Sequence, residues 1–450
     1  MENTETLDLK KLYEEGKVDE LKAELAKLHP TELAELIEGL SPGEEVLKFL
    51  ELLPDEQAAA VLLELDEDEQ ARILSKISSE DIAVRLLSNM DTDDAADLIR
   101  DLEPEQQDTI LSLVDDVEQA GDIIDLLHYD ENTAGGVMRK EMVVINENWS
   151  MPRCVDEMRQ QAEHLDELYY IYVVDDDGRL VGILPLKKVI TNPSVNMIKN
   201  VMQKDPISLH VNDKIEEVID AFEKYDLVAI PVIDSTKRLV GVITVDDVVD
   251  EMREQHEKDY QMASGLSQDV ESSDSIFHQT GARLPWLIIG MIGGIFNSQL
   301  LGQYDSVFSL MPAASLFIPL IGGTGGNVGT QSSAIIVQDL ASNSIKPGDI
   351  PKLVLKEFLV SLINASLISL IVFLYIYFFM HEPLLMTSVA LSLFCVVMFA
   401  SIFGTMVPLI MEKLKMDPAR ATGPFIAIMN DLFGMFIYML ITQSLFTFFQ

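Results

Sequence analysis

The sequence is poor in cysteine and in positive charge. Its 450 residues contain two cysteines, Cys154 and Cys395, which are too few for a disulfide framework. Lys and Arg together number 32 against 74 Asp and Glu, a net charge of −42. A chain this acidic repels phosphate backbones. The composition therefore excludes a disulfide-stabilised secreted scaffold and a nucleic-acid-binding protein, and it indicates cations as partners.

Charged residues are scarce from residue 281 onward. Residues 281–450 carry seven basic and eight acidic residues, whereas residues 1–280 carry 25 basic and 66 acidic ones, a net charge of −41. Each of the five apolar stretches in the C-terminal part exceeds the roughly 20 residues that a helix needs to cross a bilayer. They are Leu284–Tyr304, Val307–Val337, Leu355–Met380, Leu384–Met411 and Pro424–Phe449. The pattern predicts an acidic soluble part followed by five transmembrane helices, and it excludes a soluble single-domain enzyme.

The loop charges predict the orientation in the membrane. The chain opens without the basic and apolar regions of a signal peptide. All seven basic residues lie before the first stretch, between the second and third, or between the fourth and fifth. By the positive-inside rule the N-terminus is cytoplasmic and Gln450 lies outside, in a multi-pass protein of the cytoplasmic (inner) membrane.

The last stretch contains Asp431, the only ionisable residue that we expect deep in the membrane. A carboxylate there is costly, so it is typical of an ion or proton pathway. The alternative is a protonated Asp431 that hydrogen-bonds a neighbouring helix. Gly423-Pro424 is a favourable helix start, which places Asp431 about 10 Å along the helix.

The second stretch is rich in glycine. The run Gly322 to Ser333 has five glycines in eight positions, together with Thr324 and Asn327. Small residues allow close helix packing in a membrane, and the polar side chains can bridge helices or line water. Simple helix packing and pore lining therefore both remain open for this segment.

An acidic helical repeat occupies residues 28–110, within an expected all-α superhelical domain at 1–130. Its anchors are an apolar residue followed by Pro or a small polar residue and an acidic cap. They recur every 12 or 13 residues, at Leu28, Leu40, Leu53, Leu65, Ile77, Met90 and Leu102. This spacing predicts short stacked helices. Capping and the helix dipole alone already explain carboxylates at helix starts.

Residues 131–250 read as two blocks of strand, strand and helix, an α+β pair. The second block, with Leu239-Val240-Gly241-Val242-Ile243-Thr244-Val245-Asp246-Asp247, resembles cystathionine-β-synthase-type (CBS) domains, which occur in tandem and sense ligands. The resemblance implies that Thr244 and Asp247 could serve the phosphates and ribose of ATP or another adenine nucleotide. The corresponding stretch of the first block, Pro185 to Lys188, lacks the Asp.

Residues 246–280 connect the two halves of the chain. A charged stretch without Gly or Pro predicts an exposed helix at 246–264, followed by a polar hinge from Leu266 to Gly281. The segment is either a passive spacer or a control element at the junction. The sequence contains no paired-cysteine motif, metalloprotease histidine pair or nucleophile elbow, so we do not expect an enzyme.

Taken together, the chain resembles the MgtE family of bacterial magnesium channels over essentially its full length. Three segments carry the resemblance: Ala134–Met138, Pro319–Gln331 and Pro424–Gly434 with Asp431. The resemblance implies a homodimer in which Asp431 holds hydrated Mg²⁺ beside the carbonyl of Ala427. Gly423 stands where the family often has Asn.

The resemblance also implies that intracellular Mg²⁺ closes the channel and that helix 246–264 acts as a plug. The matching regulatory positions are Asp93, Asp97, Gly136, Glu216, Asp226, Asp247, Asp250 and Asp417. Lys214, Gln255 and Lys258 stand where the family commonly has carboxylates.

The chemistry of the expected pore suits magnesium. Mg²⁺ keeps several waters while it accepts one or two carboxylates, and no Cys or His near Asp431 favours a softer metal. Two alternatives remain. The first is a carrier that exchanges H⁺ or Na⁺ for Mg²⁺ through Asp431, although five spans cannot form two equal inverted halves. The second is a nucleotide-sensing membrane receptor whose spans conduct nothing.

Overall fold

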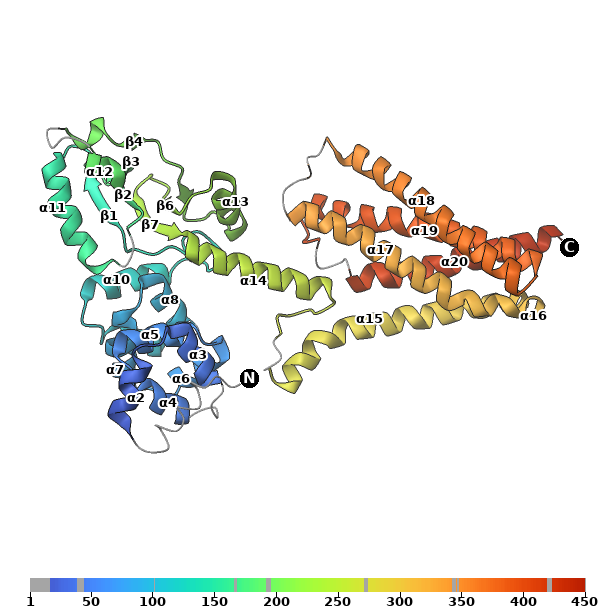
Figure 1. Cartoon of the computed structure of the whole chain (residues 1–450), viewed down its shortest axis with the longest axis horizontal. Helices are drawn as coiled ribbons and strands as arrows, with labels where there is room; N and C mark the ends of the chain where they lie inside the picture. Colours follow the sequence, from blue (N-terminus) through green and yellow to red (C-terminus); the bar gives the residue numbers. More distant parts are fainter. Residues whose placement is uncertain are drawn as a thin grey trace. The chain divides into compact units, whose positions relative to one another are not determined.

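The computed structural model describes residues 17–38, 44–100, 102–165, 168–191, 196–270, 274–341, 345, 348–418 and 423–449. The predicted repeat anchor at Leu40 and the basic residues Lys346 and Arg420 lie outside these ranges. The chain divides into two compact units, Met1–Met252 and Arg253–Gln450 (Figure 1). Helix α14 (Val245–Ala263) contains the boundary between them. We describe each unit by itself.

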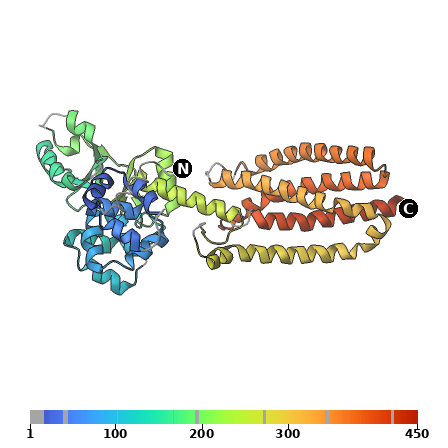
Figure 2. The same ribbon diagram turned by 60° about the horizontal axis from the view of Figure 1, so that its bottom comes forward.

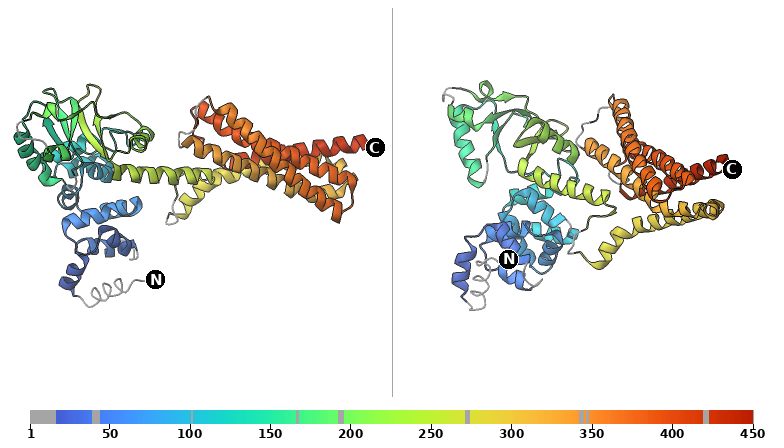
Figure 3. Two further views of the ribbon diagram at one scale, coloured as in Figure 1. Left: turned by 45° about the horizontal axis from the view of Figure 1, so that its top comes forward. Right: turned by 45° about the vertical axis from the view of Figure 1, so that its right-hand side comes forward.

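The first unit starts with an array of short helices, shown in blue in Figure 3. Polar residues begin several of them: Ser78 accepts a hydrogen bond from the amide of Asp81, and Asp116 accepts from the amide of Glu118. The predicted repeat is interrupted where a π-helical turn, Ile82–Leu86, runs into a 3-10 turn, Leu87–Asn89. The α-helices are α2 Val18–Leu25, α3 Pro30–Glu38, α4 Glu44–Leu50, α5 Asp55–Leu63, α6 Glu67–Leu74, α7 Ser79–Asp81, α8 Thr92–Arg100, α9 Pro104–Leu111 and α10 Val117–Leu126.

Two small sheets follow, one for each CBS block. The first has the order β1-β2-β3-β4 and the second the order β5-β6-β7. The predicted strand pairs are present as β2 with β3 and β6 with β7, both antiparallel. Each sheet also has a parallel strand, β1 or β5, that the sequence analysis did not predict. The strands are β1 Val143–Asn146, β2 Tyr170–Val174, β3 Leu180–Pro185, β4 Gln203–Lys204, β5 Leu209–His210, β6 Ala229–Ile233 and β7 Leu239–Thr244.

Four helices accompany the sheets: α11 Met151–Gln161, α12 Leu186–Thr191, α13 Ile215–Tyr225 and α14. One hydrophobic core runs from the N-terminal helices through Met138 into the second block, where it includes Ile230 and Ile243. The first block has a separate core around Val143, Ile171 and Leu184. The helical domain is therefore packed together with the second CBS block.

The second unit is a bundle of long helices that run alongside one another (Figure 2). Within the described residues, four of them are long and apolar enough to cross a membrane: α15 Ile276–Gln303, α18 Ile350–Phe379, α19 Pro383–Lys413 and α20 Gly423–Phe449. The predicted stretch 307–337 is broken into α16 Asp305–Leu310, a 3-10 turn Pro312–Phe317 and α17 Ile318–Ala341. Pro312 lacks an amide hydrogen, which disfavours a continuous helix there.

Helix α17 contacts both α19 and α20, and α19 also contacts α18 and α20. Small residues lie along the buried side of α19, among them Ser392, Ala400, Ser401 and Gly404. Small side chains let membrane helices approach closely. The glycine-rich α17 is thus held between two apolar helices.

Candidate functional site

The membrane candidate is centred on Asp431 in α20, which is half-buried in the single chain. Its carboxylate faces the glycine row of α17. A methyl group built on Gly322 would lie 3.4 Å from Oδ1 of Asp431, and one built on Gly326 would lie 3.6 Å from it. These glycines are one turn apart on the same face of the helix. They leave the carboxylate oxygen beside backbone rather than beside a bulky side chain.

The residue before Asp431 is also unusual. Asn430 is 1% exposed, and neither atom of its side-chain amide has a hydrogen-bond partner among the described residues. A methyl group on Gly329 of α17 would overlap this amide, and one on Gly404 of α19 would overlap the carbonyl of Gly329. Helices α17, α19 and α20 therefore meet here at a distance that only glycine permits.

The structure separates the other predicted pore residues. Ala427 lies one turn before Asp431 on α20. Thr324 and Asn327 lie on α17, the first partly exposed and the second exposed. Two residues correspond to about 200° on a helix, so Thr324 does not share the face of Gly322 and Gly326 that contacts Asp431.

Gly423 begins α20 and packs against the end of α14. A methyl group on Gly423 would overlap the carbonyl oxygen of Ala263, and one on Gly265 would lie 2.5 Å from Cγ of Pro424. The sequence analysis treated Gly423 as the loss of a side chain. In the structure its missing Cβ lets the connecting helix approach the start of α20.

A second, partly buried carboxylate, Glu357, makes hydrogen bonds within the bundle, and the sequence analysis did not single it out. Glu357 lies seven residues after the first residue of α18, about 10 Å along the helix. Its Oε1 accepts hydrogen bonds from Ser332 of α17, at 2.7 Å, and from Ser401 of α19. Glu357 therefore joins three helices. The pair Lys356-Glu357 at the start of the apolar stretch was the available signal.

In the first unit, the acidic candidate is the start of α8. Glu141 caps this helix: its Oε1 accepts from the amide of Thr92 at 3.1 Å, and its Oε2 accepts from the Thr92 hydroxyl at 2.8 Å. The next residue, Asp93, is 6% exposed, and its Oδ1 has no hydrogen-bond partner among the described residues. Burial, together with repulsion by Asp94 and Asp247, raises the pKa of Asp93 well above its usual value.

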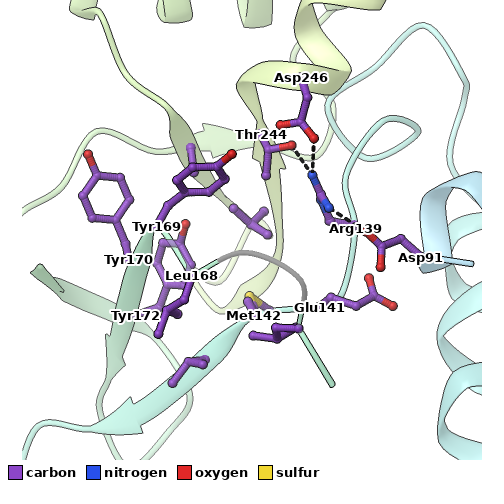
Figure 4. Close-up of a pocket in the computed structure, with 14 residues that line it drawn as sticks. Asp91, Arg139, Glu141, Met142, Leu168, Tyr169, Tyr170, Tyr172, Thr244 and Asp246 are labelled. Carbon is purple, nitrogen blue, oxygen red and sulfur yellow. Dashed lines mark hydrogen bonds and ion pairs between the residues drawn. The ribbon is translucent and has the colours of Figure 1, made fainter. Parts of the chain in front are cut away.

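Arg139 lies between this helix and the second CBS block (Figure 4). Its guanidinium donates to Asp91 at 2.6 Å, to Asp246 at 3.0 Å and to Asp247 at 3.3 Å, and it also contacts Thr244. Burial opposes its charge, but the surrounding carboxylates outweigh burial and raise the pKa of Arg139. The sequence analysis missed this residue because its partners are distant in the chain.

Of the predicted regulatory residues, the structure brings together Asp93 and Asp247 around Arg139. Asp97, Glu216, Asp226 and Asp250 are exposed, and Asp97 pairs with Arg100 at 3.1 Å. Asp417 is partly buried in the segment after α19, and Gly136 packs against the backbone of Asp130. Within the described ranges, no three His, Cys, Asp or Glu residues are grouped closely enough to hold a metal ion.

A cavity of about 290 Å³ lies beside Arg139 in the CBS pair. One wall is aromatic and apolar, whereas the other is polar (Figure 4). Its lining includes Met142, Leu168, Tyr169, Tyr170, Tyr172, Asp91, Arg139, Glu141, Thr244 and Asp246. The aromatic rings can stack on a nucleotide base. The cation and the hydroxyl on the opposite wall can bind the phosphate or the ribose, so the cavity suits a nucleotide.

The structure modifies the predicted nucleotide residues in one respect. Thr244 lines the cavity, and its hydroxyl donates to Oδ2 of Asp247 at 2.5 Å. Asp247 is thereby occupied by Thr244 and Arg139, and its neighbour Asp246 forms the cavity wall. The three tyrosines were not predicted, although Tyr169-Tyr170 and Tyr172 stand together in the sequence.

Family models match the helical domain, the CBS pair and most of the C-terminal helices. The MgtE intracellular N domain matches residues 28–132, CBS domains match 134–194 and 198–254, and the MgtE divalent cation transporter family matches 318–441. The MgtE magnesium transporter of Thermus thermophilus is 33% identical over 453 residues, 99% of each chain. That of Enterococcus faecalis is 35% identical over 322 residues, 71% of each chain.

Among solved structures, the cytosolic domain of the Mg²⁺ channel MgtE in complex with ATP is 31% identical, with a TM-score of 0.51. It covers 55% of this chain and 99% of its own. The acidic helical domain, the CBS pair and the apolar helices define a multidomain membrane transporter of divalent cations, not an enzyme. The chain belongs to the MgtE family of magnesium transporters.

Proposed function

We propose that this transporter is a Mg²⁺-selective channel that mediates magnesium uptake across the cytoplasmic membrane. The observation that carries the proposal is the carboxylate of Asp431 beside Gly322 and Gly326. A single carboxylate with no bulky side chain on the facing turn of α17 suits an ion that keeps most of its water. The carbonyl of Ala427, one turn earlier, is the neighbouring ligand to the hydrated ion.

The pore forms between two subunits of a homodimer, so that two copies of Asp431 face one water-filled axis. Helix α17 supplies the fifth span: its 24 residues reach about 36 Å, and its Gly, Thr and Asn content keeps it less apolar than the other four. Asn327 and Thr324 line the path at other levels. The acidic unit lies in the cytoplasm and the C-terminus outside, as the loop charges favour.

Intracellular Mg²⁺ closes this channel. Carboxylates such as Asp93 and Asp247 repel one another, and a divalent cation between them favours the packed arrangement of the helical domain on the CBS pair. To change the ratio of closed to open channels from 1:99 to 99:1, Mg²⁺ must bind the closed state more favourably than the open state by about 5.5 kcal/mol. Several weak sites can supply this difference together. Asp97, Gly136, Glu216, Asp226, Asp250 and Asp417 are the further proposed ligands, and α14 transmits the change as a plug.

The cavity of the CBS pair takes an adenine nucleotide. The tyrosine wall suits the base, Asp246 can accept hydrogen bonds from the ribose hydroxyls, and Thr244 and Arg139 can donate to the phosphates. The solved MgtE cytosolic domain contains ATP, which favours ATP as the nucleotide. Thr244, which the sequence analysis named as a nucleotide-binding residue, also lines this cavity.

The direct test is Mg²⁺ flux into proteoliposomes. Asp431→Asn keeps the shape of the side chain and removes its charge, so we expect at least a tenfold loss of flux. Asp305→Asn, at the exposed start of α16, is the matched control and should conduct like the wild type. Equal flux in Asp431→Asn and the wild type would contradict the proposal.

The same assay separates the alternatives. A channel carries Mg²⁺ down its own gradient without a counter-ion, whereas a carrier requires a gradient of H⁺ or Na⁺. A nucleotide-sensing receptor would show no flux in any variant.

A further inference from the structure

Among the residues that the structure describes, Arg139 is the one basic side chain in the acidic junction between α8 and the second CBS block. We propose that Arg139 is a tethered cation that partly neutralises this junction when Mg²⁺ is absent, and so reduces the number of Mg²⁺ ions needed to hold the helical domain on the CBS pair. The inference rests on the proposed role of the acidic unit as a Mg²⁺ sensor.

The backbone of Arg139 belongs to the second CBS block. Its amide donates to the carbonyl of Val242 at 2.8 Å, and its carbonyl accepts from the amide of Val242 at 2.9 Å. This pair fixes the residue to β7. The neighbouring Gly241 makes the approach possible, because a methyl group there would lie 2.9 Å from the carbonyl oxygen of Arg139.

The guanidinium reaches across to the helical domain. Its shortest ion pair is with Asp91, which directly precedes α8, at 2.6 Å. The same group also contacts Asp246 and Asp247 on α14. The side chain is 16% exposed, so water screens these ion pairs less than surface pairs. One cation therefore links carboxylates of two domains.

The charge of Arg139 is too small to neutralise the junction. Five carboxylates interact there (Asp91, Asp93, Asp94, Asp246 and Asp247) against one guanidinium. The Oδ1 atom of Asp93 is buried and has no partner among the described residues. The remaining negative charge and this free oxygen leave a role for a divalent cation beside Arg139.

Arg139 and Mg²⁺ both favour docking of the helical domain on the CBS pair, so removal of Arg139 should change how docking depends on Mg²⁺. If Arg139 is removed, the domains separate more readily without metal, and additional Mg²⁺ must enter when they dock. Docking then depends more steeply on Mg²⁺, whereas at saturating Mg²⁺ it is restored. A residue with only a structural role would weaken docking equally at every Mg²⁺ concentration.

The experiment measures docking in the full-length chain in lipid nanodiscs. Spin labels on genetically encoded non-natural residues at the exposed positions Glu35 in α3 and Glu223 in α13 report the distance between the helical domain and the second CBS block. The docked fraction is measured from EDTA to saturating Mg²⁺. The variants are Arg139→Gln and the matched control Lys140→Gln, which removes a contact at 2.5 Å to Asp125, away from the acidic junction.

We expect Arg139→Gln to lower the docking constant in EDTA about tenfold, because the variant loses hydrogen bonds between charged groups. We also expect a steeper dependence on Mg²⁺ and docking equal to the wild type at saturation. Lys140→Gln should shift the curve without changing its slope. A curve for Arg139→Gln that coincides with the wild type, or lies parallel to it, would overturn the proposal.

Failure of the sensor function itself has a different signature. In that case docking of the wild type would not change with Mg²⁺ at all. If docking of Arg139→Gln is then weaker than that of the wild type by the same factor at every Mg²⁺ concentration, the contact is purely structural and the tethered-cation proposal is overturned, as it is by unchanged docking.

Discussion

At the scale of single residues, two carboxylates are held in costly positions. Asp431 lies within a membrane helix, and Asp93 is buried with one oxygen unsatisfied among the described residues. An isolated buried charge is expensive unless a counter-charge compensates it. Both positions are consistent with binding sites for a cation that is not part of the chain.

Asp93→Asn should stabilise α8 when Mg²⁺ is absent. The neutral amide is cheaper to bury and is not repelled by Asp94 and Asp247, so the opening free energy of α8 should rise by about 1–3 kcal/mol. Hydrogen exchange of α8 in EDTA measures it. The protection gained on adding Mg²⁺ should shrink in the variant. Asp108→Asn, at an exposed site on the next helix, α9, is the control and should change neither value.

The same substitution should reduce a pH dependence to which Asp94 and Glu141, whose pKa values are also raised by burial, contribute as well. Because the pKa of Asp93 is raised, the folded chain holds this proton at pH values where the unfolded chain has lost it. The stability of α8 without metal should therefore fall as the pH rises from about 4 through the raised pKa. If Asp93→Asn and the wild type show the same slope, Asp93 is not the group responsible.

At the scale of elements, glycines set the distances between helices. Gly329 and Gly404 allow α17, α19 and α20 to cross closely, and Gly423 allows the end of α14 to approach α20. The sequence analysis identified the glycine run but left pore lining and packing open. The structure assigns Gly322 and Gly326 to the neighbourhood of Asp431 and Gly329 to helix packing.

Gly423→Ala should weaken the link between α14 and the start of α20. The added methyl group overlaps the carbonyl of Ala263, so the connecting helix must move away. If α14 acts as the plug, the variant should conduct Mg²⁺ at an internal Mg²⁺ concentration that closes the wild type. Flux into proteoliposomes with Mg²⁺ inside measures this. Gly290→Ala is the control and should behave like the wild type, because the added methyl group would lie 3.8 Å from the nearest atom. If Gly423→Ala closes at the internal Mg²⁺ concentration that closes the wild type, α14 does not act as the plug.

Much of the architecture was predictable because it depends on local patterns. The strand pairs β2–β3 and β6–β7 followed from apolar runs with polar turns, and the membrane helices followed from length and apolarity. The short parallel strands β1 and β5 were missed because each needs a partner that is distant in sequence. Arg139 and the Glu357 network were missed for the same reason: their partners come from other domains or helices.

At the scale of the whole molecule, the acidic unit and the membrane unit divide the work. In the proposed function the acidic unit senses the cation and the membrane unit conducts it; residues 1–280 carry a net charge of −41. The two units join through a single covalent connection within α14. We therefore expect control of the pore by the acidic unit to require the intact chain.

Removal of residues 1–250 should leave conduction intact and abolish its inhibition by internal Mg²⁺. The deletion removes the acidic junction but retains all helices of the second unit. Flux measured over a range of internal Mg²⁺ should be constant in the truncated chain and should fall in the full-length chain. Equal inhibition in both would place the sensor elsewhere.

The most direct test of the account is whether residue 431 is in contact with water inside the membrane. In a chain without Cys154 and Cys395, Asp431→Cys is exposed to a charged thiosulfonate reagent. Leu440→Cys, on the opposite and exposed side of the same helix, is the comparison. We expect Asp431→Cys to react at least ten times faster, because it lies on the ion pathway. Equal reaction rates, or reaction only with a membrane-soluble reagent, would contradict the proposed pore.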